Sequence, residues 1–88
     1  MRTTPFFERR SRKILRRHPD LAAPLDDVLA RLAENPDEPT LRLHHLSGRL
    51  DGHHAVSITY DYRIVLVLRR VAGFIVLIDI GSHDEVYR

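Results

Sequence analysis

The chain has 88 residues, 43% hydrophobic and 30% charged, so it is expected to form one domain, residues 1–88, which excludes a second domain and wholesale disorder. The absence of cysteine excludes disulfides and thiolate metal sites and favours a reducing cytoplasm. Its longest strongly apolar run, residues 64–68, is far shorter than a membrane span, and residues 1–5 do not resemble a secretory signal. We therefore expect a soluble, cytoplasmic protein without a membrane partner.

The net charge of +2 is unevenly distributed along the chain. Residues 1–18 contain seven basic side chains against Glu8 alone, whereas residues 19–40 contain six acidic side chains against Arg31. A clustered basic segment is either a solvated helix face or a contact with a nucleic-acid backbone, because such contacts release counterions from the phosphates. The candidates for RNA binding in this segment are Arg9, Arg12, Lys13 and Arg16.

Two helices are predicted in the first half of the chain. Residues 6–17 are good helix formers with apolar side chains at helical spacing, and His18-Pro19 marks the end because proline disfavours helix in the preceding residue. Asp20 is the expected cap of the second helix, and Asn35-Pro36 its stop. The buried face of this helix is predicted to comprise Leu21, Leu25, Val28, Leu29 and Leu32. The two helices are expected to form a hairpin.

Strands are predicted in the second half. Residues 41–43 alternate briefly before a turn at 44–48, and Val56, Ile58 and Tyr60 share one face of a half-buried strand. Residues 64–68 and 74–80 are apolar on both faces, so they are expected at the centre of the sheet, joined by a hairpin turn at 71–73. The predicted fold is α+β: an N-terminal helical hairpin packed on a three- to four-stranded twisted antiparallel sheet.

Six histidines are many for a chain of this length, and histidine is the side chain best suited to proton transfer near neutral pH. Four of them stand in adjacent pairs, His44-His45 and His53-His54, and neighbours in a strand point to opposite faces. This spacing argues against a zinc site, so neither a metal nor another cofactor is expected. Asp61 and Arg63 would share one face of an extended segment, and taken alone the pair is better explained as a surface ion pair near a turn.

Three fragments together resemble the toxins of the RelE/ParE superfamily, in particular its RelE/YafQ-like members. These fragments are residues 44–48 (His-His-Leu-Ser-Gly), 61–65 (Asp-Tyr-Arg-Ile-Val) and 80–87 (Ile-Gly-Ser-His-Asp-Glu-Val-Tyr). The preceding helix pair fits as well, so the resemblance covers nearly the whole chain. Only a few residues before Pro5 remain for the family's first strand, which is expected to be short.

The resemblance implies a type II toxin that cleaves messenger RNA in the ribosomal A site without a metal. In such enzymes the 2′-hydroxyl of the RNA attacks the adjacent phosphorus, so the protein must supply a base, an acid for the leaving 5′-oxygen and a cation. The resemblance also implies a cognate antitoxin, which would form a hetero-oligomer with the toxin.

Site residues follow from the same resemblance. His83 corresponds to the general acid, Asp61 and His44 to the polar pair around the 2′-hydroxyl, Arg63 to the phosphate-stabilising cation and Tyr87 to an aromatic position near the substrate base. At position 57 the YafQ-like members have a further histidine, whereas this chain has a serine, and serine cannot replace histidine as a proton acceptor. The sequence therefore leaves the general base open.

Two other functions fit the same resemblance. A ParE-like protein would poison DNA gyrase through protein contacts on the same fold without nuclease activity. A degenerate module would only bind its antitoxin, and the serine at position 57 is compatible with that. His83 with Asp61 and Arg63 favours the nuclease, because a gyrase binder needs neither an acid nor a base.

Overall fold

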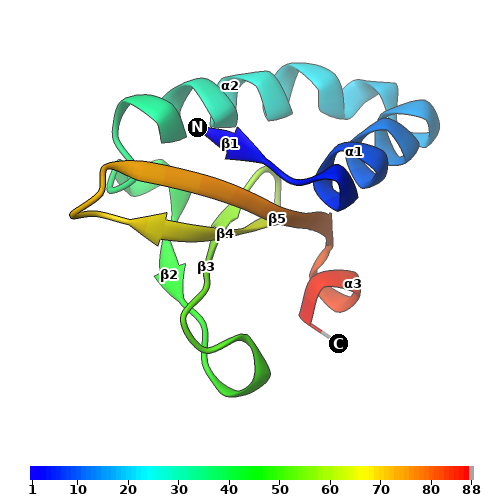
Figure 1. Ribbon diagram of the computed structural model, residues 1–88. Helices are drawn as coiled ribbons and strands as arrows, with labels where there is room; N and C mark the ends of the chain where they lie inside the picture. The colour runs from blue at the N-terminus through cyan, green and yellow to red at the C-terminus, as the bar shows by residue number, and fades with distance from the viewer. Residues whose placement is uncertain (88) are drawn as a thin grey trace.

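The computed structural model describes residues 1–87. It has two layers: helices α1 (Pro5–Arg17) and α2 (Ala22–Glu34) cover one face of a five-stranded sheet, and a short helix α3 (His83–Tyr87) lies on the other side (Figure 1). The predicted α+β class, helical hairpin and packing on a sheet are confirmed.

Local sequence signals determine where the two long helices begin and end. The Thr4 hydroxyl caps α1 by accepting the Phe7 N–H at 3.1 Å, and Pro5 occupies the first turn, where its missing N–H costs nothing. A 3-10 turn, Pro19–Leu21, separates α1 from α2. Asp20 lies inside this turn rather than at a cap, so its predicted capping role is wrong: Leu21 stands at the start of α2 and no side chain caps it.

The sheet has the strand order β1-β5-β4-β3-β2. β2 (His44–His45), β3 (His54–Ser57), β4 (Tyr62–Arg69) and β5 (Phe74–Ser82) pair antiparallel, and β1 (Arg2–Thr3) pairs parallel with β5. The predicted central position of the two apolar strands is confirmed. The expected strand count of three to four is too low, because a two-residue strand such as β1 has no alternation to detect. The sheet is mixed rather than antiparallel, because β1 pairs parallel with β5.

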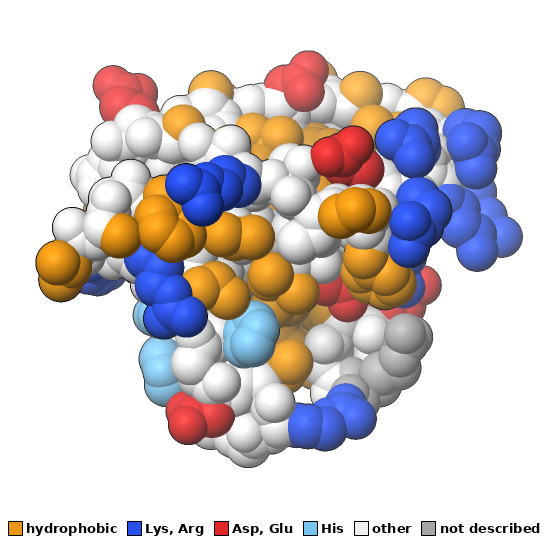
Figure 2. Space-filling model, viewed as in Figure 1, with side chains coloured by type: hydrophobic (Ala, Val, Ile, Leu, Met, Phe, Trp, Pro, Cys, Tyr) orange, Lys and Arg blue, Asp and Glu red, His pale blue; other side chains and the backbone are white. Residues whose placement is uncertain are grey.

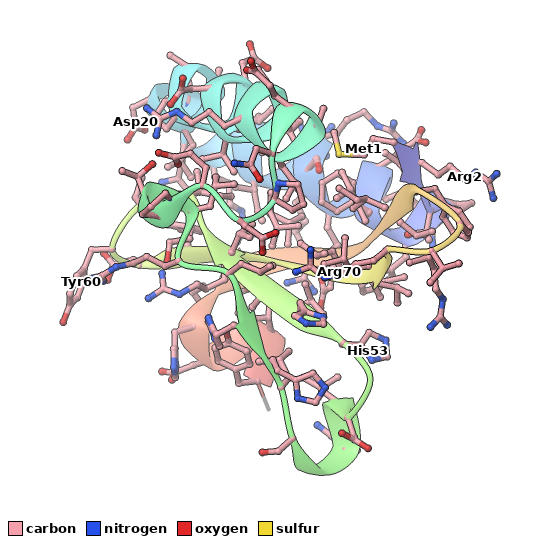
Figure 3. All side chains as sticks on the ribbon, turned by 90° about the vertical axis from the view of Figure 1, so that its left-hand side faces the viewer. Met1, Arg2, Asp20, His53, Tyr60 and Arg70 are labelled. Carbon is pink, nitrogen blue, oxygen red and sulfur yellow. The ribbon has the colours of Figure 1, made fainter. Side chains whose placement is uncertain are left out.

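The predicted strand through Val56, Ile58 and Tyr60 is partly wrong. β3 ends at Ser57, and the chain bends over residues 58–61 before β4 begins. Tyr60 is 89% exposed and points away from the molecule (Figure 3). The alternation of apolar residues continues through the bend, so periodicity alone predicted a strand where the backbone turns.

Each face of the sheet has its own hydrophobic cluster. The main cluster joins α1 and α2 to one face through buried side chains such as Phe7, Leu32, Ile64 and Leu77. On the opposite face a smaller cluster is formed by Leu46, Ala55, Val65 and Val86. Because Val86 belongs to α3 and Leu46 follows β2, this second cluster fixes α3 and the segment after β2 against the face that the long helices leave uncovered (Figure 1). Among residues 1–87 the two long helices have 13 residues each, which is too short for a membrane span.

Candidate active site

A cavity of about 410 Å³ lies beside the second hydrophobic cluster, between α3 and the segment that follows β2. Three of the five predicted catalytic residues, His44, His83 and Tyr87, line it together with Leu46, Ser47, Arg49 and Leu50. These residues come from positions 44–50 and 83–87, which the sheet brings together. We take this cavity as the candidate active site.

His83 is the first residue of α3 and is positioned by a capping box. The Ser82 hydroxyl accepts the Glu85 N–H at 3.3 Å, and the Glu85 carboxylate accepts the Ser82 N–H at 2.9 Å. The side chain of His83 is 63% exposed, and its Nδ1 lies 3.6 Å from the Asp84 carboxylate. The imidazole is thus held at an ordered helix start while it remains accessible to solvent. The Ser-x-x-Glu pattern at 82–85 was a readable signal for α3 that the sequence interpretation missed.

Asp61 is joined to His83 through the backbone: the His83 N–H donates to the Asp61 carbonyl at 3.0 Å. Asp61 and His83 also line a shallow hollow of about 320 Å³ together with Tyr62, Ser82 and Asp84. The expected extended segment from Asp61 to Arg63 is wrong, because Asp61 lies in the bend before β4. Among the described side chains no ion pair links Asp61 to Arg63, so the alternative surface ion pair is wrong as well.

The tautomer of His44 follows from its two partners. Its Nδ1 lies 2.9 Å from the backbone carbonyl of Arg42, and a carbonyl only accepts, so the proton is assigned to Nδ1. Arg42 has the left-handed conformation, with φ of 54°, which brings this carbonyl close to the ring. In the neutral imidazole Nε2 is then an acceptor, and it faces the Tyr87 hydroxyl at 3.3 Å. His44 therefore presents a proton-accepting nitrogen to the cavity.

Tyr87 connects the other site residues. Its ring meets the ring of His83 edge to face, with centroids 4.5 Å apart, and its hydroxyl reaches His44. Burial raises the pKa of Tyr87 above its ordinary value, while the charge of Arg63 and a hydrogen bond with it act in the opposite direction. Because burial is the largest effect, Tyr87 keeps its proton at neutral pH and serves as a hydrogen-bond donor.

Arg63 is held by backbone carbonyls. Its Nη1 donates to the carbonyls of Thr59, Tyr60 and Tyr62 at 2.9, 2.8 and 3.2 Å, so the bend before β4 wraps around the guanidinium. In the sheet, Arg63 stands opposite Gly81 on one side and opposite Ser57 on the other. Arg63 and Ser57 share a second, open cavity of about 450 Å³ that extends toward α2. Ser57 therefore neighbours the site, without a ring nitrogen to accept a proton.

The remaining histidines of the sheet lie apart from this cavity. The rings of His45 and His54 meet edge to face at 5.1 Å across the β2–β3 pair. Burial lowers the pKa of His54, with smaller effects in the same direction from His45, Arg70 and His44 and an opposing one from Asp37. Within the described part of the chain, no group of three or more His, Cys, Asp or Glu side chains is arranged to hold a metal ion.

The basic side chains of the predicted RNA-binding segment lie on α1 (Figure 2). Arg9, Arg12, Lys13 and Arg16 are all exposed, and none of them lines the cavity with His44 and His83. The structure thus presents two separate features, a cavity with acid–base side chains and a cationic helix.

Comparison with known proteins gives a structural likeness without a sequence match. No family model and no curated protein matches the chain. YafQ from E. coli strain BL21(DE3) superposes with a TM-score of 0.84 at 16% identity, covering 99% of this chain and 96% of that one. A metal-bound toxin from Helicobacter pylori gives 0.79 at 25% identity over 98% and 96%, and the E. coli DinJ-YafQ complex gives 0.77 at 18% over 99% and 96%. The chain has the RelE/YafQ-like toxin fold.

Proposed function

We propose that this chain, which has the fold of RelE/YafQ-like toxins, is the toxin of a type II toxin–antitoxin pair and cleaves messenger RNA on the ribosome. The observation that carries the proposal is the convergence of His44, Tyr87 and His83 on one cavity, with Asp61 bound to the backbone of His83. Solvent-accessible acid–base groups held on ordered elements are what cleavage by a 2′-hydroxyl requires.

The reaction transfers one proton at each end of the phosphodiester. The 2′-hydroxyl of the bound RNA replaces the Tyr87 hydroxyl at the single lone pair of His44 Nε2. His44 Nε2 accepts the proton of this 2′-hydroxyl as the 2′-oxygen forms a bond to phosphorus. His83 donates a proton to the 5′-oxygen as its bond to phosphorus breaks, which leaves a 2′,3′-cyclic phosphate and a 5′-hydroxyl. His44 takes the role of base because its Nδ1 proton is engaged by Arg42, which leaves Nε2 as the acceptor. This assignment offers an answer to the question raised by Ser57.

Three further residues support the transition state in this scheme. Arg63 supplies fixed positive charge near Tyr87 and stabilises the charge that develops on the phosphate oxygens. Tyr87, protonated at neutral pH, orients the His44 ring and offers its own ring to a base of the substrate. Asp61, which lines the same hollow as His83, offers a carboxylate acceptor to a hydroxyl group of the substrate.

The exposed basic side chains of α1, among them Arg9, Arg12, Lys13 and Arg16, are proposed to attract the RNA backbone, and an antitoxin is proposed to neutralise them. The structural likeness to the YafQ chain of the DinJ-YafQ complex supports an antitoxin partner and a hetero-oligomer. The proposed place of action is the cytoplasm, where messenger and ribosomes are found.

The test is a cleavage assay with ribosomes programmed with a defined messenger and the purified protein. We expect cuts in the messenger in the A site, with 2′,3′-cyclic phosphate ends. A parallel supercoiling assay uses DNA gyrase with stoichiometric protein. Inhibition of gyrase while the messenger stays intact contradicts the proposal and favours a ParE-like protein, and no effect in either assay favours a module that only binds its antitoxin.

A further inference from the structure

A small cationic pocket lies at the C-terminal end of α1, next to the start of β4. It has a volume of about 150 Å³ and is lined by Arg10, Lys13, Ile14, Arg17, His18, Tyr62 and Glu85. The lining thus has three permanently charged cations and a histidine but only one carboxylate. We call it the α1 pocket.

The α1 pocket selects one face of the basic helix. Arg10, Lys13 and Arg17 are spaced three and four residues apart, on the side of α1 that carries the buried Ile14. At about 100° per residue, Arg12 and Arg16 point about 160° away from Ile14, and neither of them lines the pocket. The pocket therefore divides the basic residues of α1 into an inner set and an outer set, a division that the sequence interpretation did not make.

Arg10 is fixed in the pocket wall. Its side chain is 19% exposed, and its Nη2 lies so close to Gly81 that a Cβ at that position would stand 2.8 Å from it. The nearest carboxylate oxygen belongs to Glu85 at 3.8 Å, which is an ion pair but too long for a hydrogen bond, and Nη2 has no hydrogen-bond partner among residues 1–87. The wall thus holds a positive charge whose contacts among residues 1–87 are this long ion pair and the Phe6 ring, with the ring centroid 5.6 Å from the guanidinium carbon.

Aromatic rings complete the pocket. The rings of His18 and Tyr62 lie 5.7 Å apart at an interplanar angle of 57°. Tyr62 stands directly opposite Ser82 in the β4–β5 pair, one residue before His83, and it also lines the hollow that contains Asp61 and His83. Tyr62 is therefore the shared wall between the α1 pocket and the residues proposed for catalysis.

We propose that the α1 pocket binds a phosphate group of single-stranded RNA next to the cleaved bond, with an adjacent base stacked on His18 and Tyr62. This inference rests on the proposed ribonuclease function. Arginine and lysine side chains converging on one point suit the several oxygens of a phosphate, and aromatic faces beside such cations are typical of single-strand binding. At about 150 Å³ the pocket is smaller than the ~300–1,000 Å³ that encloses a drug-sized ligand, so it suits a phosphate rather than a whole nucleotide.

The first experiment measures binding without cleavage. A fluorescent 2′-O-methyl RNA hexamer, which lacks the nucleophilic hydroxyl, is titrated with the full chain at fixed low salt. The variant Lys13→Gln/Arg17→Gln removes two charges of the inner set, and the matched control Arg12→Gln/Arg16→Gln removes two from the outer set at the same spacing. We expect roughly a tenfold loss of affinity for the first and about a twofold loss for the second, because only the first removes direct phosphate contacts. Equal losses would overturn the proposal.

The second experiment tests the aromatic rings. Tyr62→Leu is expected to weaken hexamer binding about tenfold, whereas Tyr62→Phe, which keeps the ring, binds within about twofold of the unmodified chain. Equal affinities for the two variants contradict the stacking role. If circular dichroism shows that Tyr62→Leu does not fold, the proposal is tested by the affinity of the exposed double variant Lys13→Gln/Arg17→Gln relative to its control.

A third measurement separates phosphate from base. Inorganic phosphate and adenosine 5′-monophosphate are titrated separately, and the ring protons of His18 are followed by NMR. Both are expected to shift these resonances, with the nucleotide binding more tightly, and His18 resonances that move with neither ligand overturn the proposal. If messenger is cut but the two double variants bind equally, the pocket is disproved and the ribonuclease stands. If the double variants differ in affinity but the messenger stays intact, RNA binding by the α1 pocket stands and the ribonuclease function is disproved.

Discussion

The backbone N–H of His83 donates to the backbone carbonyl of Asp61 across 3.0 Å. This bond continues the β4–β5 pairing one step past Tyr62 and Ser82, so the two residues are joined by the sheet itself. Because the link uses main-chain atoms, replacing either side chain leaves it in place. The chemistry of Asp61 and His83 is therefore separable from their structural connection.

His83→Gln is expected to lower the rate of messenger cleavage by about 10²–10⁴-fold, since glutamine cannot donate a proton to the leaving oxygen. The side chain is largely exposed, so the thermal midpoint should stay close to that of the unmodified chain. His45→Gln, on the other face of β2, is the matched histidine control and should cleave normally. Wild-type cleavage by His83→Gln would show that the acid is assigned to the wrong residue.

The neutral form of the His44 ring is expected to carry its proton on Nδ1, because Nδ1 faces the Arg42 carbonyl. Nitrogen-15 NMR of the histidine rings, with His44→Gln to assign the signal, reports this tautomer directly. The same variant should cleave at least about 10²-fold more slowly if His44 is the base. Finding the proton on Nε2 would leave His44 unable to accept one from the 2′-hydroxyl.

Ser82→Ala is expected to reduce the free energy of unfolding by about 1 kcal/mol through loss of the capping box. Cleavage should fall as well, because α3 positions His83. Ser82→Thr retains a capping hydroxyl and should preserve most of both properties. Urea denaturation and the cleavage assay measure the two effects, and an unchanged rate in Ser82→Ala would mean that the cap does not position His83.

Leu77→Ala is expected to destabilise the chain by about 2–5 kcal/mol, because Leu77 is 1% exposed in the main cluster and its truncation leaves a cavity. Val71→Ala, in the fully exposed hairpin turn, should change stability by less than about 0.5 kcal/mol. Urea unfolding of the two variants checks this difference. Similar losses for both would contradict the assignment of the core.

The stability of the chain is expected to fall as the pH is lowered from about 6.5, partly because of His54. Its pKa is lower in the folded chain than the ordinary value of 6.5, so the unfolded chain takes up the proton first. The contribution is therefore fully present above pH 6.5 and is lost as the pH falls through the folded pKa. Urea midpoints between pH 7.5 and 5 should decline less in His54→Gln, and identical slopes would exclude this role of His54.

Part of the fold was predictable because its signals are local. The helices follow from apolar spacing and from the His18-Pro19 break, and the central strands from runs of β-branched residues. β1 is too short to leave a pattern, and the bend at 58–61 carries an alternation typical of a strand. The capping box at Ser82 was readable, and it predicts the start of α3 that places His83.

The sequence by itself determined the kinds of residue at the candidate site and, by resemblance, the fold on which they stand. It could not determine which of them meet. His44 and Tyr87 are 43 positions apart, and they come together because the pairing of β2 with β3, β3 with β4 and β4 with β5 brings β2 opposite α3. Likewise, the division of the basic residues of α1 into an inner and an outer set was decided when α1 packed beside Tyr62. Side-chain type is local information, whereas proximity depends on strand register and packing, which only the folded chain possesses.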